Sequence, residues 1–251
     1  MRAQRLATEI VRPALHHGPA LGLAPDKVTV RLGDTRLPAS HAAIGSATMA
    51  NAGAAVLLAA KAAREKAMAL AKDKVNIGYG ELLARHGLST LVAEADYDPV
   101  EEANGPKAIF SFAALFAEVR VDPELGLVRL SRFVGAYDAG RIINPKTARS
   151  QAIGGIIWGV GQALFEQSET DPVLGRFLHR NYSGYLVPTN ADIPELETLF
   201  VGEHDEEASP LGAKGLGELT AVSVAPAIAN AVYHATGKRV RDLPITVEKL
   251  L

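Results

Sequence analysis

Residues 115–134 read LFAEVRVDPELGLVRLSRFV and carry the clearest secondary-structure signal of the chain. Apolar side chains occupy every second position from Leu115 to Val121, the period of a half-buried strand. The residues DPELG, 122–126, are typical of a turn, and apolar positions resume at Val128 and Leu130. The stretch therefore predicts a β-hairpin.

Helices are expected on both sides of this hairpin. The Ala-, Leu- and Lys-rich segment 52–72 predicts a long helix, and 79–89 a short one. Pro145 suits the first turn of a helix that runs to about Gln167. A last helix should begin near Glu218 and end at Gly237 in a left-handed cap, with Pro226 kinking or interrupting it.

The remaining segments give weaker signals. Alternation within LGLAPDKVTVRL, 21–32, predicts a strand closed by a turn at Gly33-Asp34, and 98–107 resembles a loop. Gly155 and Gly159 should let another backbone approach the second long helix. The sequence DPVLG, 171–175, repeats the hairpin turn without any surrounding repeat. Intermixed helices and strands without a regular β-α-β period indicate the α+β class.

Composition excludes several functions. The 251 residues carry 26 Lys+Arg against 28 Asp+Glu, so the net charge of −2 argues against a strongly basic nucleic-acid binder. No apolar run reaches the roughly 20 residues of a membrane span, and we expect no signal peptide of the chain's own. The absence of Cys excludes disulfides, thiolate zinc sites, Cys-ligated iron–sulfur clusters and a Cys nucleophile.

One glycine-rich loop stands out, GAKGLGE at 212–218. Its three glycines permit positive φ angles before a helix start, a setting that suits an anion, although a helix-capping loop explains them equally well. It lacks the spacing of a nucleotide P-loop. Glu218 in the first helical turn could act as a base kept ionised by the helix dipole, or only stabilise that dipole.

No metal ligands are predicted. The seven His residues form no ligand pattern, and satisfied core or surface roles suit them better. The acidic run Glu203–Glu207 could attract a divalent cation, but such runs are usually solvated loops.

The blocks at 117–167 and 185–246, read together, resemble the C-terminal part of the molybdenum-binding subunit of the xanthine dehydrogenase and aldehyde oxidase family. Within that family, the sequence of these blocks is most similar to the branch of bacterial periplasmic aldehyde oxidoreductases. LGLAPDKVTVRLGDTRLP at 21–38 extends the resemblance upstream. It implies that residues 21–251 form a C-terminal molybdopterin-binding domain, partial relative to the family subunit, with mixed sheets and long packed helices. Residues 1–20 form a separate N-terminal segment without assignment.

The resemblance implies part of a molybdenum hydroxylase that oxidises aldehydes, or N-heterocycles such as xanthine, with oxygen from water. Glu218 matches the family's base, which takes the proton from the molybdenum-bound hydroxyl. The positions that match cofactor contacts are Gly45, Ser46, Gln151, Lys214, Gly215 and Gly217. Their alternative roles are a turn, a helix-surface amide and a helix cap.

The implied cofactor is molybdenum–molybdopterin in its cytosine dinucleotide form, with iron–sulfur clusters and FAD on partner subunits only. A further partner is the upstream N-terminal half of the molybdenum subunit, if the subunit is split, and the chain is expected to be inactive without it. Neither nucleic acid nor membrane is an expected partner. Expected locations are the cytoplasm, or the periplasm by co-export with a partner.

Two other functions stay open. The chain could be a catalytically silent truncated fragment or interaction module that retains the fold, using its glycine-rich helix for packing. It could also be a simple phosphate- or nucleotide-binding module built on Gly212–Gly217.

Overall fold

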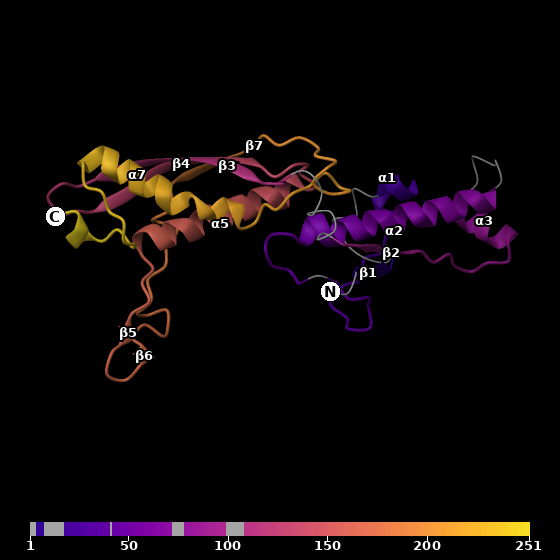
Figure 1. Cartoon of the computed structure of the whole chain (residues 1–251), viewed down its shortest axis with the longest axis horizontal. Coiled ribbons are helices and arrows are strands. Elements are labelled where there is room, and N and C mark those ends of the chain that lie inside the picture. The colour runs from indigo at the N-terminus through magenta and orange to yellow at the C-terminus, as the bar shows by residue number, and fades with distance from the viewer. Residues whose placement is uncertain (1–3, 8–17, 41, 72–77, 99–107) are drawn as a thin grey trace. The chain divides into compact units, whose positions relative to one another are not determined.

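The computed structural model describes residues 4–7, 18–40, 42–71, 78–98 and 108–251 (Figure 1). The chain divides into two compact units, which are treated separately below. Unit 1 comprises Met1–Phe110, Gly140–Asn144 and Glu203–Gly215. Unit 2 comprises Ser111–Ala139, Pro145–Gly202 and Leu216–Leu251. The domain limits expected from the sequence, 1–20 and 21–251, stay a prediction.

Unit 1 is built on helix α2, Thr48–Ala71. This helix confirms the long one predicted at 52–72 and starts four residues earlier. Its alanine-rich face is buried, and it packs on β2, Glu94–Tyr97, which pairs antiparallel with β1, Gln4–Ala7. The unit's shorter elements are α1 (Gly18–Leu21), the 3₁₀ helix η2 (Pro25–Lys27) and α3 (Tyr79–Arg85).

The strand predicted within 21–32 is wrong. The chain from Val28 to Leu32 forms no ladder with any described strand, and the Leu32 side chain is 70% exposed. Alternating side chains make a strand only where a neighbouring strand supplies hydrogen bonds. The turn after it is present, since the Leu37 N–H donates to the Asp34 carbonyl. The loop expected at 98–107 lies outside the described residues except for its first position.

Unit 2 contains a three-stranded sheet in the order β3-β4-β7. Strands β3, Phe112–Val121, and β4, Val128–Asp138, pair antiparallel and confirm the predicted hairpin. Strand β7, Glu195–Phe200, runs parallel to β4. Helix α5, Pro145–Leu164, connects β4 to β7 and has proline in its first turn as predicted.

The core of unit 2 lies between the sheet and two long helices (Figure 1). Its fully buried members include Phe133 from β4, Ile156 from α5 and Ile228 from α7, Val224–Thr236. The α+β class and the long packed helices are therefore confirmed. The chain ends with the 3₁₀ helix η3, Val247–Lys249.

Proline interrupts the last helical segment, as predicted. Helix α6, Leu219–Val222, is separated from α7 by Ser223. Pro226 has no N–H to donate to the Val222 carbonyl four residues earlier, and this missing bond accounts for the interruption between α6 and α7. Helix α7 ends as expected at Gly237, which adopts the left-handed conformation with φ 73°.

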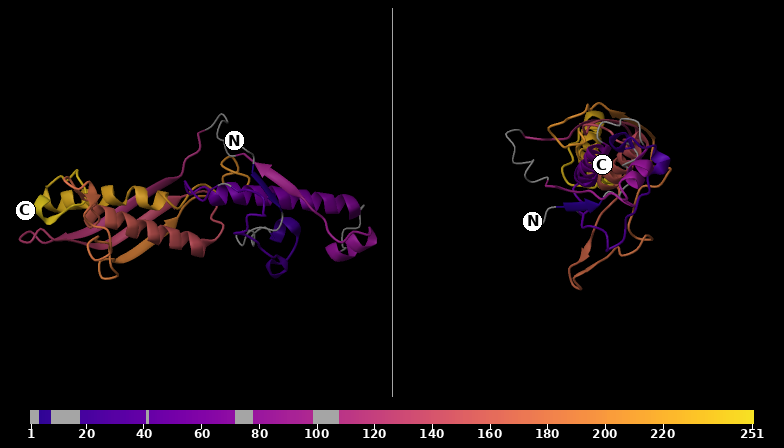
Figure 2. Two further views of the ribbon diagram at one scale, coloured as in Figure 1. Left: turned by 90° about the horizontal axis from the view of Figure 1, so that it is seen from below. Right: turned by 90° about the vertical axis from the view of Figure 1, so that its right-hand side faces the viewer.

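The two Asp-Pro-x-Leu-Gly turns share one hydrogen-bond pattern. In each turn the aspartate Oδ1 accepts from the N–H groups two and three residues later, and the glycine N–H donates to the aspartate carbonyl. The second turn joins β5, Thr170–Asp171, to β6, Arg176–Phe177. Figure 1 and the right-hand view of Figure 2 show this hairpin extending away from α5 and α7.

None of the described helices is long and apolar enough to cross a membrane.

Candidate functional site

Two consecutive residues with positive φ form the first loop of the candidate site, in unit 1. Gly45 has φ 60° and Ser46 has φ 57°. The Ala47 N–H donates to the Ile44 carbonyl at 3.3 Å, so these residues are the centre of a tight turn of the kind that needs two positive φ angles. Ser46 is the one non-glycine residue with positive φ in the described part of the chain, and such strain gathers at functional sites.

A second loop of unit 1, residues 209–215, is fixed by buried hydrogen bonds. The Ser209 hydroxyl is fully buried, donates to the Ala213 carbonyl at 2.8 Å and accepts from the Ala213 N–H at 3.1 Å. The Gly212 carbonyl accepts from the Arg141 N–H at 2.6 Å. This loop therefore keeps its shape through its own contacts.

The two loops meet at Gly215. An ideal Cβ on Gly215 would lie 3.5 Å from the Ser46 Cβ and 3.7 Å from the Gly45 carbonyl oxygen, although 169 residues separate Ser46 from Gly215. The structure thus brings together three of the predicted cofactor contacts. Of the three loop glycines expected to permit positive φ, only Gly212, at 69°, uses it, and Gly215 instead allows close approach.

Lys214 adds positive charge beside these loops. Its side chain is only 9% exposed, and its Nζ lies 3.7 Å from the Asp205 Oδ2. The residues of these loops include the Ser46 hydroxyl and the Lys214 ammonium, groups that can bind an anion, and the Lys214 ammonium is paired with the Asp205 carboxylate. They fit the anionic, organic part of a cofactor, and a Cβ on Gly215 would narrow the space between the loops.

Bare metal ions have no evident cage in the described part of the chain. It contains no group of three or more His, Asp or Glu side chains placed to hold a metal. Within the acidic run Glu203–Glu207, His204 lies 3.7 Å from Glu206, and Asp205 pairs with Lys214. The cation-binding alternative for this run therefore has no support from the described residues.

Glu218 belongs to unit 2, where it immediately precedes α6. Its side chain is exposed and makes no capping hydrogen bond to the helix. The sequence placed Glu218 in the first turn of a long helix whose dipole would keep it ionised. The long helix is not formed as one piece, because it breaks at Ser223 and α6 has only four residues. The two roles considered for Glu218, a base or a group that stabilises the helix dipole, stay predictions.

The backbone before Glu218 is held by Thr220, a residue that sequence reasoning missed. The Thr220 side chain is fully buried, and its hydroxyl donates to the Gly217 carbonyl at 2.7 Å and lies 3.3 Å from the Gln151 carbonyl oxygen. It thereby links two predicted site residues, Gln151 and Gly217. The Gln151 side chain is exposed, so its main-chain carbonyl makes this link.

Space for Thr220 comes from Gly155 on α5. An ideal Cβ on Gly155 would lie 1.8 Å from the Thr220 Oγ1, and one on Gly159 would lie 2.3 Å from the Val224 Cβ. This confirms the close approach predicted for the Gly155-x-x-x-Gly159 face. The spacing of these glycines was the available signal, but it did not identify the partner segment.

Tyr137, near the end of β4, was not singled out from the sequence. It is fully buried, and burial raises its pKa to about 12. Its hydroxyl has no hydrogen-bond partner among the described residues and lies 2.2 Å from the position of an ideal Cβ on Gly135. The Thr198 hydroxyl, on the β7 residue that pairs with Gly135, is also buried, and no described residue hydrogen-bonds to it.

Comparisons with known proteins identify the family of the chain. A family model described as a molybdopterin cofactor-binding domain matches residues 17–194. The aldehyde oxidoreductase molybdenum-binding subunit PaoC of Escherichia coli K12 is 52% identical over 141 residues, which are 56% of this chain and 19% of that protein. The xanthine dehydrogenase molybdenum-binding subunit of Escherichia coli O157:H7 is 40% identical over 140 residues, 56% of this chain and 18% of that protein.

The solved structure of aldehyde oxidoreductase from Desulfovibrio gigas shares the fold. It superposes with a TM-score of 0.81 at 24% identity, over 99% of this chain and 30% of that one. The matched region thus spans about a fifth of the two curated relatives and less than a third of the Desulfovibrio gigas chain. The chain belongs to the molybdopterin cofactor-binding family found in the molybdenum-binding subunits of xanthine dehydrogenases and aldehyde oxidoreductases.

Proposed function

We propose that this chain forms part of a molybdenum hydroxylase that oxidises an aldehyde, or an N-heterocycle of the xanthine type, with oxygen from water. The observation that carries the proposal is the family match over residues 17–194, joined by the 52% identity to a molybdenum-binding subunit of an aldehyde oxidoreductase. The substrate loses a C–H bond and gains a C–O bond. Two electrons leave through the partner subunits, and the protons leave through side chains and water.

Unit 1 would contribute the cofactor contacts. The Gly45–Ser46 turn and Gly215 would lie against the pterin, and the Lys214 ammonium would face its negative charge. When bound, the molybdenum cofactor supplies the two-electron acceptor and activates the oxygen that comes from water. We further propose the cytosine dinucleotide form, which acid release of cytidine monophosphate from the purified complex would test.

Glu218 would act as the base. Its carboxylate is exposed, and the buried Thr220 hydroxyl fixes the preceding Gly217 carbonyl. A carboxylate oxygen can accept the proton released when the water-derived hydroxyl attacks the substrate carbon, which contributes about 10² to 10⁴ in rate in typical enzymes. Gln151 and Gly217 would position this segment through their carbonyl groups.

The electron path would use an iron–sulfur subunit and an FAD subunit, since this sequence contains no Cys to bind a cluster. The remainder of the molybdenum-binding subunit would complete the active site. Relatives of this chain are named as subunits, which supports an assembly of several chains. We propose that the assembly works in the cytoplasm, or in the periplasm after co-export.

The proposal is tested by co-expressing the chain with the polypeptide encoded immediately upstream and with the partner subunits. Molybdenum and pterin content and aldehyde oxidation are measured for the wild type, Glu218→Gln and Glu203→Gln. Glu203 is an exposed carboxylate outside the proposed base, so its variant controls for the loss of one charge.

We expect Glu218→Gln to retain molybdenum and pterin and to lose at least 10²-fold in turnover, with Glu203→Gln within twofold of the wild type. Wild-type turnover by Glu218→Gln would overturn the role of Glu218. A complex without molybdenum and pterin would instead favour the silent fragment that retains the fold.

A further inference from the structure

A hairpin arm, residues 167–184, projects from unit 2 and has a closed base (Figures 1 and 2). The Tyr185 hydroxyl donates to the Glu166 Oε2 at 3.0 Å across the base, and this bond raises the pKa of Tyr185. An ideal Cβ on Gly161 would lie 2.0 Å from the Glu166 Oε1, so the glycine makes room for this side chain. The arm therefore leaves α5 from a fixed position.

Hydrogen bonds within the arm hold its shape. The Asp171 Oδ1 accepts from the Val173 N–H at 2.9 Å and the Leu174 N–H at 3.1 Å. The Leu178 N–H donates to the Glu169 carbonyl at 2.9 Å on the way back. Because these bonds are internal, the arm is shaped before it meets any partner, which lowers the entropy cost of docking.

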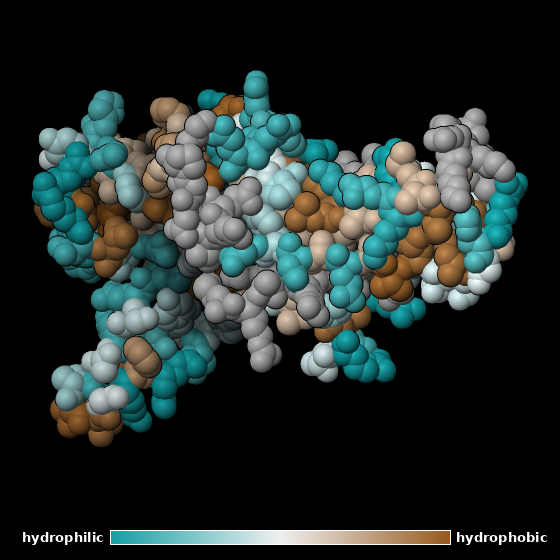
Figure 3. Space-filling view, turned by 45° about the vertical axis from the view of Figure 1, so that its right-hand side comes forward, coloured by the Kyte–Doolittle hydropathy of each residue, from teal (hydrophilic) through white to brown (hydrophobic). Residues whose placement is uncertain are grey.

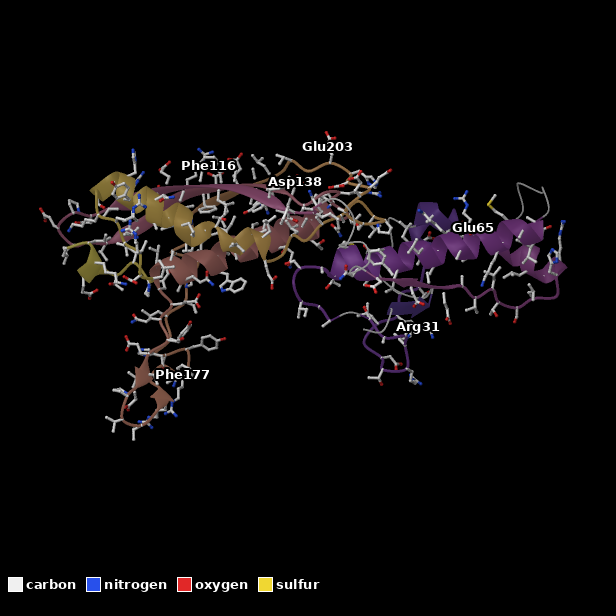
Figure 4. The ribbon with its side chains drawn as sticks, viewed as in Figure 1. Arg31, Glu65, Phe116, Asp138, Phe177 and Glu203 are labelled. Carbon is white, nitrogen blue, oxygen red and sulfur yellow. The ribbon has the colours of Figure 1, made fainter. Side chains whose placement is uncertain are left out.

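The arm exposes large apolar side chains. Val173 is 87% exposed and Leu174 60% at the tip, Phe177 and Leu178 are 59% and 50% exposed along the return strand, and Tyr182 is 90% exposed. Figure 3 shows hydrophobic surface at the far end of the projection, and Figure 4 shows Phe177 on the arm. A cluster of this kind marks an interaction surface, whereas a single exposed apolar residue needs no explanation.

The turn itself does not require the valine of the arm. The matching turn between β3 and β4 has the same hydrogen bonds and carries Glu124 where the arm carries Val173, whereas leucine follows in both turns. Valine at this exposed position is thus a property of the surface, independent of the backbone geometry. A partner surface that removes Val173 from water explains the valine.

We propose that the arm docks into an apolar surface of the remainder of the molybdenum-binding subunit. This inference rests on the proposed function. The occupant is argued from length, because the matched region covers less than a third of the Desulfovibrio gigas chain and about a fifth of PaoC. In both of these relatives the matched region is part of a longer chain. The charges of the arm are mixed, with Asp171 near Arg176 and Glu169 within 3.7 Å of His179, so burial of apolar surface dominates the contact.

The test measures binding and needs no enzymatic activity. The full 251-residue chain is titrated into the tagged polypeptide encoded immediately upstream, and the dissociation constant is compared for the wild type, Leu174→Lys and Leu125→Lys. The two leucines occupy the same position of the two turns and are 60% and 57% exposed, so the second variant is a matched control. Circular dichroism checks that each variant keeps its fold.

We expect Leu174→Lys to weaken binding at least tenfold and Leu125→Lys to stay within twofold of the wild type. Equal binding by Leu174→Lys and the wild type, or no wild-type binding at all, would overturn the proposal. Self-association of the isolated chain that Leu174→Lys abolishes would assign the arm to a second copy and overturn the occupant. A failure of Glu218→Gln to lose activity leaves this binding result unchanged, so the two proposals fail separately.

Discussion

Glycines serve opposite purposes in unit 1 and in unit 2. On α5 of unit 2, Gly155 and Gly159 are buried, and the side chains of Thr220 and Val224 fill the space that a Cβ would need. In the loops of unit 1, an ideal Cβ on Gly45 would meet nothing within 4 Å, and one on Gly215 would make only ordinary contacts. The first region closes space between elements, and the second leaves space beside a loop.

This difference separates packing from binding. The closed glycines are Gly155 and Gly159, whose Cβ positions are filled by other residues. They bring Thr220 against α5, and Thr220 fixes the backbone before the proposed base, so replacement of these glycines acts on folding. The open glycines are Gly45 and Gly215, beside which a Cβ would find space. They cost conformational entropy on folding and permit no closer packing, which is expected where a ligand approaches the backbone. Four measurements test this difference between closed and open glycines.

The largest effect is expected at Gly155. Gly155→Ala places a methyl group 1.8 Å from the Thr220 Oγ1, and the overlap should lower the free energy of unfolding by about 2 kcal/mol or more. The neighbouring Gly154→Ala is the control, since its Cβ would meet nothing within 4 Å and alanine favours a helix by about 1 kcal/mol. Urea unfolding should show that the two variants change the free energy of unfolding in opposite directions. Equal changes would show that Gly155 is not required for close packing.

Tyr137 extends the closed class to the sheet, since its hydroxyl fills the space beside Gly135. Its pKa is raised from 10.0 to about 12 in the folded protein, so the folded state holds a proton that the unfolded chain releases. This contribution is complete below pH 10 and is lost as the pH rises towards 12, with a slope of at most about 1.4 kcal/mol per pH unit. Tyr137→Phe should reduce the slope when urea unfolding is followed from pH 8 to 11, with the remainder left to other groups such as Tyr185, whose pKa is also raised; identical slopes would refute the assignment.

Gly45 tests the open class through backbone strain alone. Gly45→Ala should cost about 1 kcal/mol of unfolding free energy, because alanine resists the φ of 60° although the space around it is empty. Gly45→Asn should recover most of that loss, since asparagine tolerates the left-handed conformation. Thermal unfolding of the two variants measures the difference, and a larger loss for asparagine would indicate a hidden contact.

The smallest effect on stability is expected at Gly215, together with a large effect on binding. A Cβ there makes contacts of 3.5 to 3.7 Å, so Gly215→Ala should change the unfolding free energy by less than about 0.5 kcal/mol. The same methyl group would narrow the space proposed for the pterin, and the molybdenum content of the co-expressed complex should fall at least fivefold. Full molybdenum content in this variant would place the cofactor elsewhere.

Much of the local structure followed from the sequence. The hairpin at 115–134, α2 and α5 were predicted because alternation, helix propensity and turn residues act over a few neighbouring positions. The strand within 21–32 was not predictable in this way, since alternation does not supply a partner. The break of the last helix at Ser223 followed from the sequence, because Pro226 has no N–H for the Val222 carbonyl.

The sequence by itself determined the family, the hairpin, the long helices and the glycine positions at which close approach is possible. Only the tertiary structure decided what each glycine approaches: Thr220 at Gly155, and the Gly45–Ser46 turn at Gly215. It also decided that Glu218 follows a backbone carbonyl held by a buried hydroxyl. Propensities depend on neighbours in the chain, whereas the contacts of Gly155 and Gly215 join residues 65 and 170 positions apart and exist only once the chain has packed.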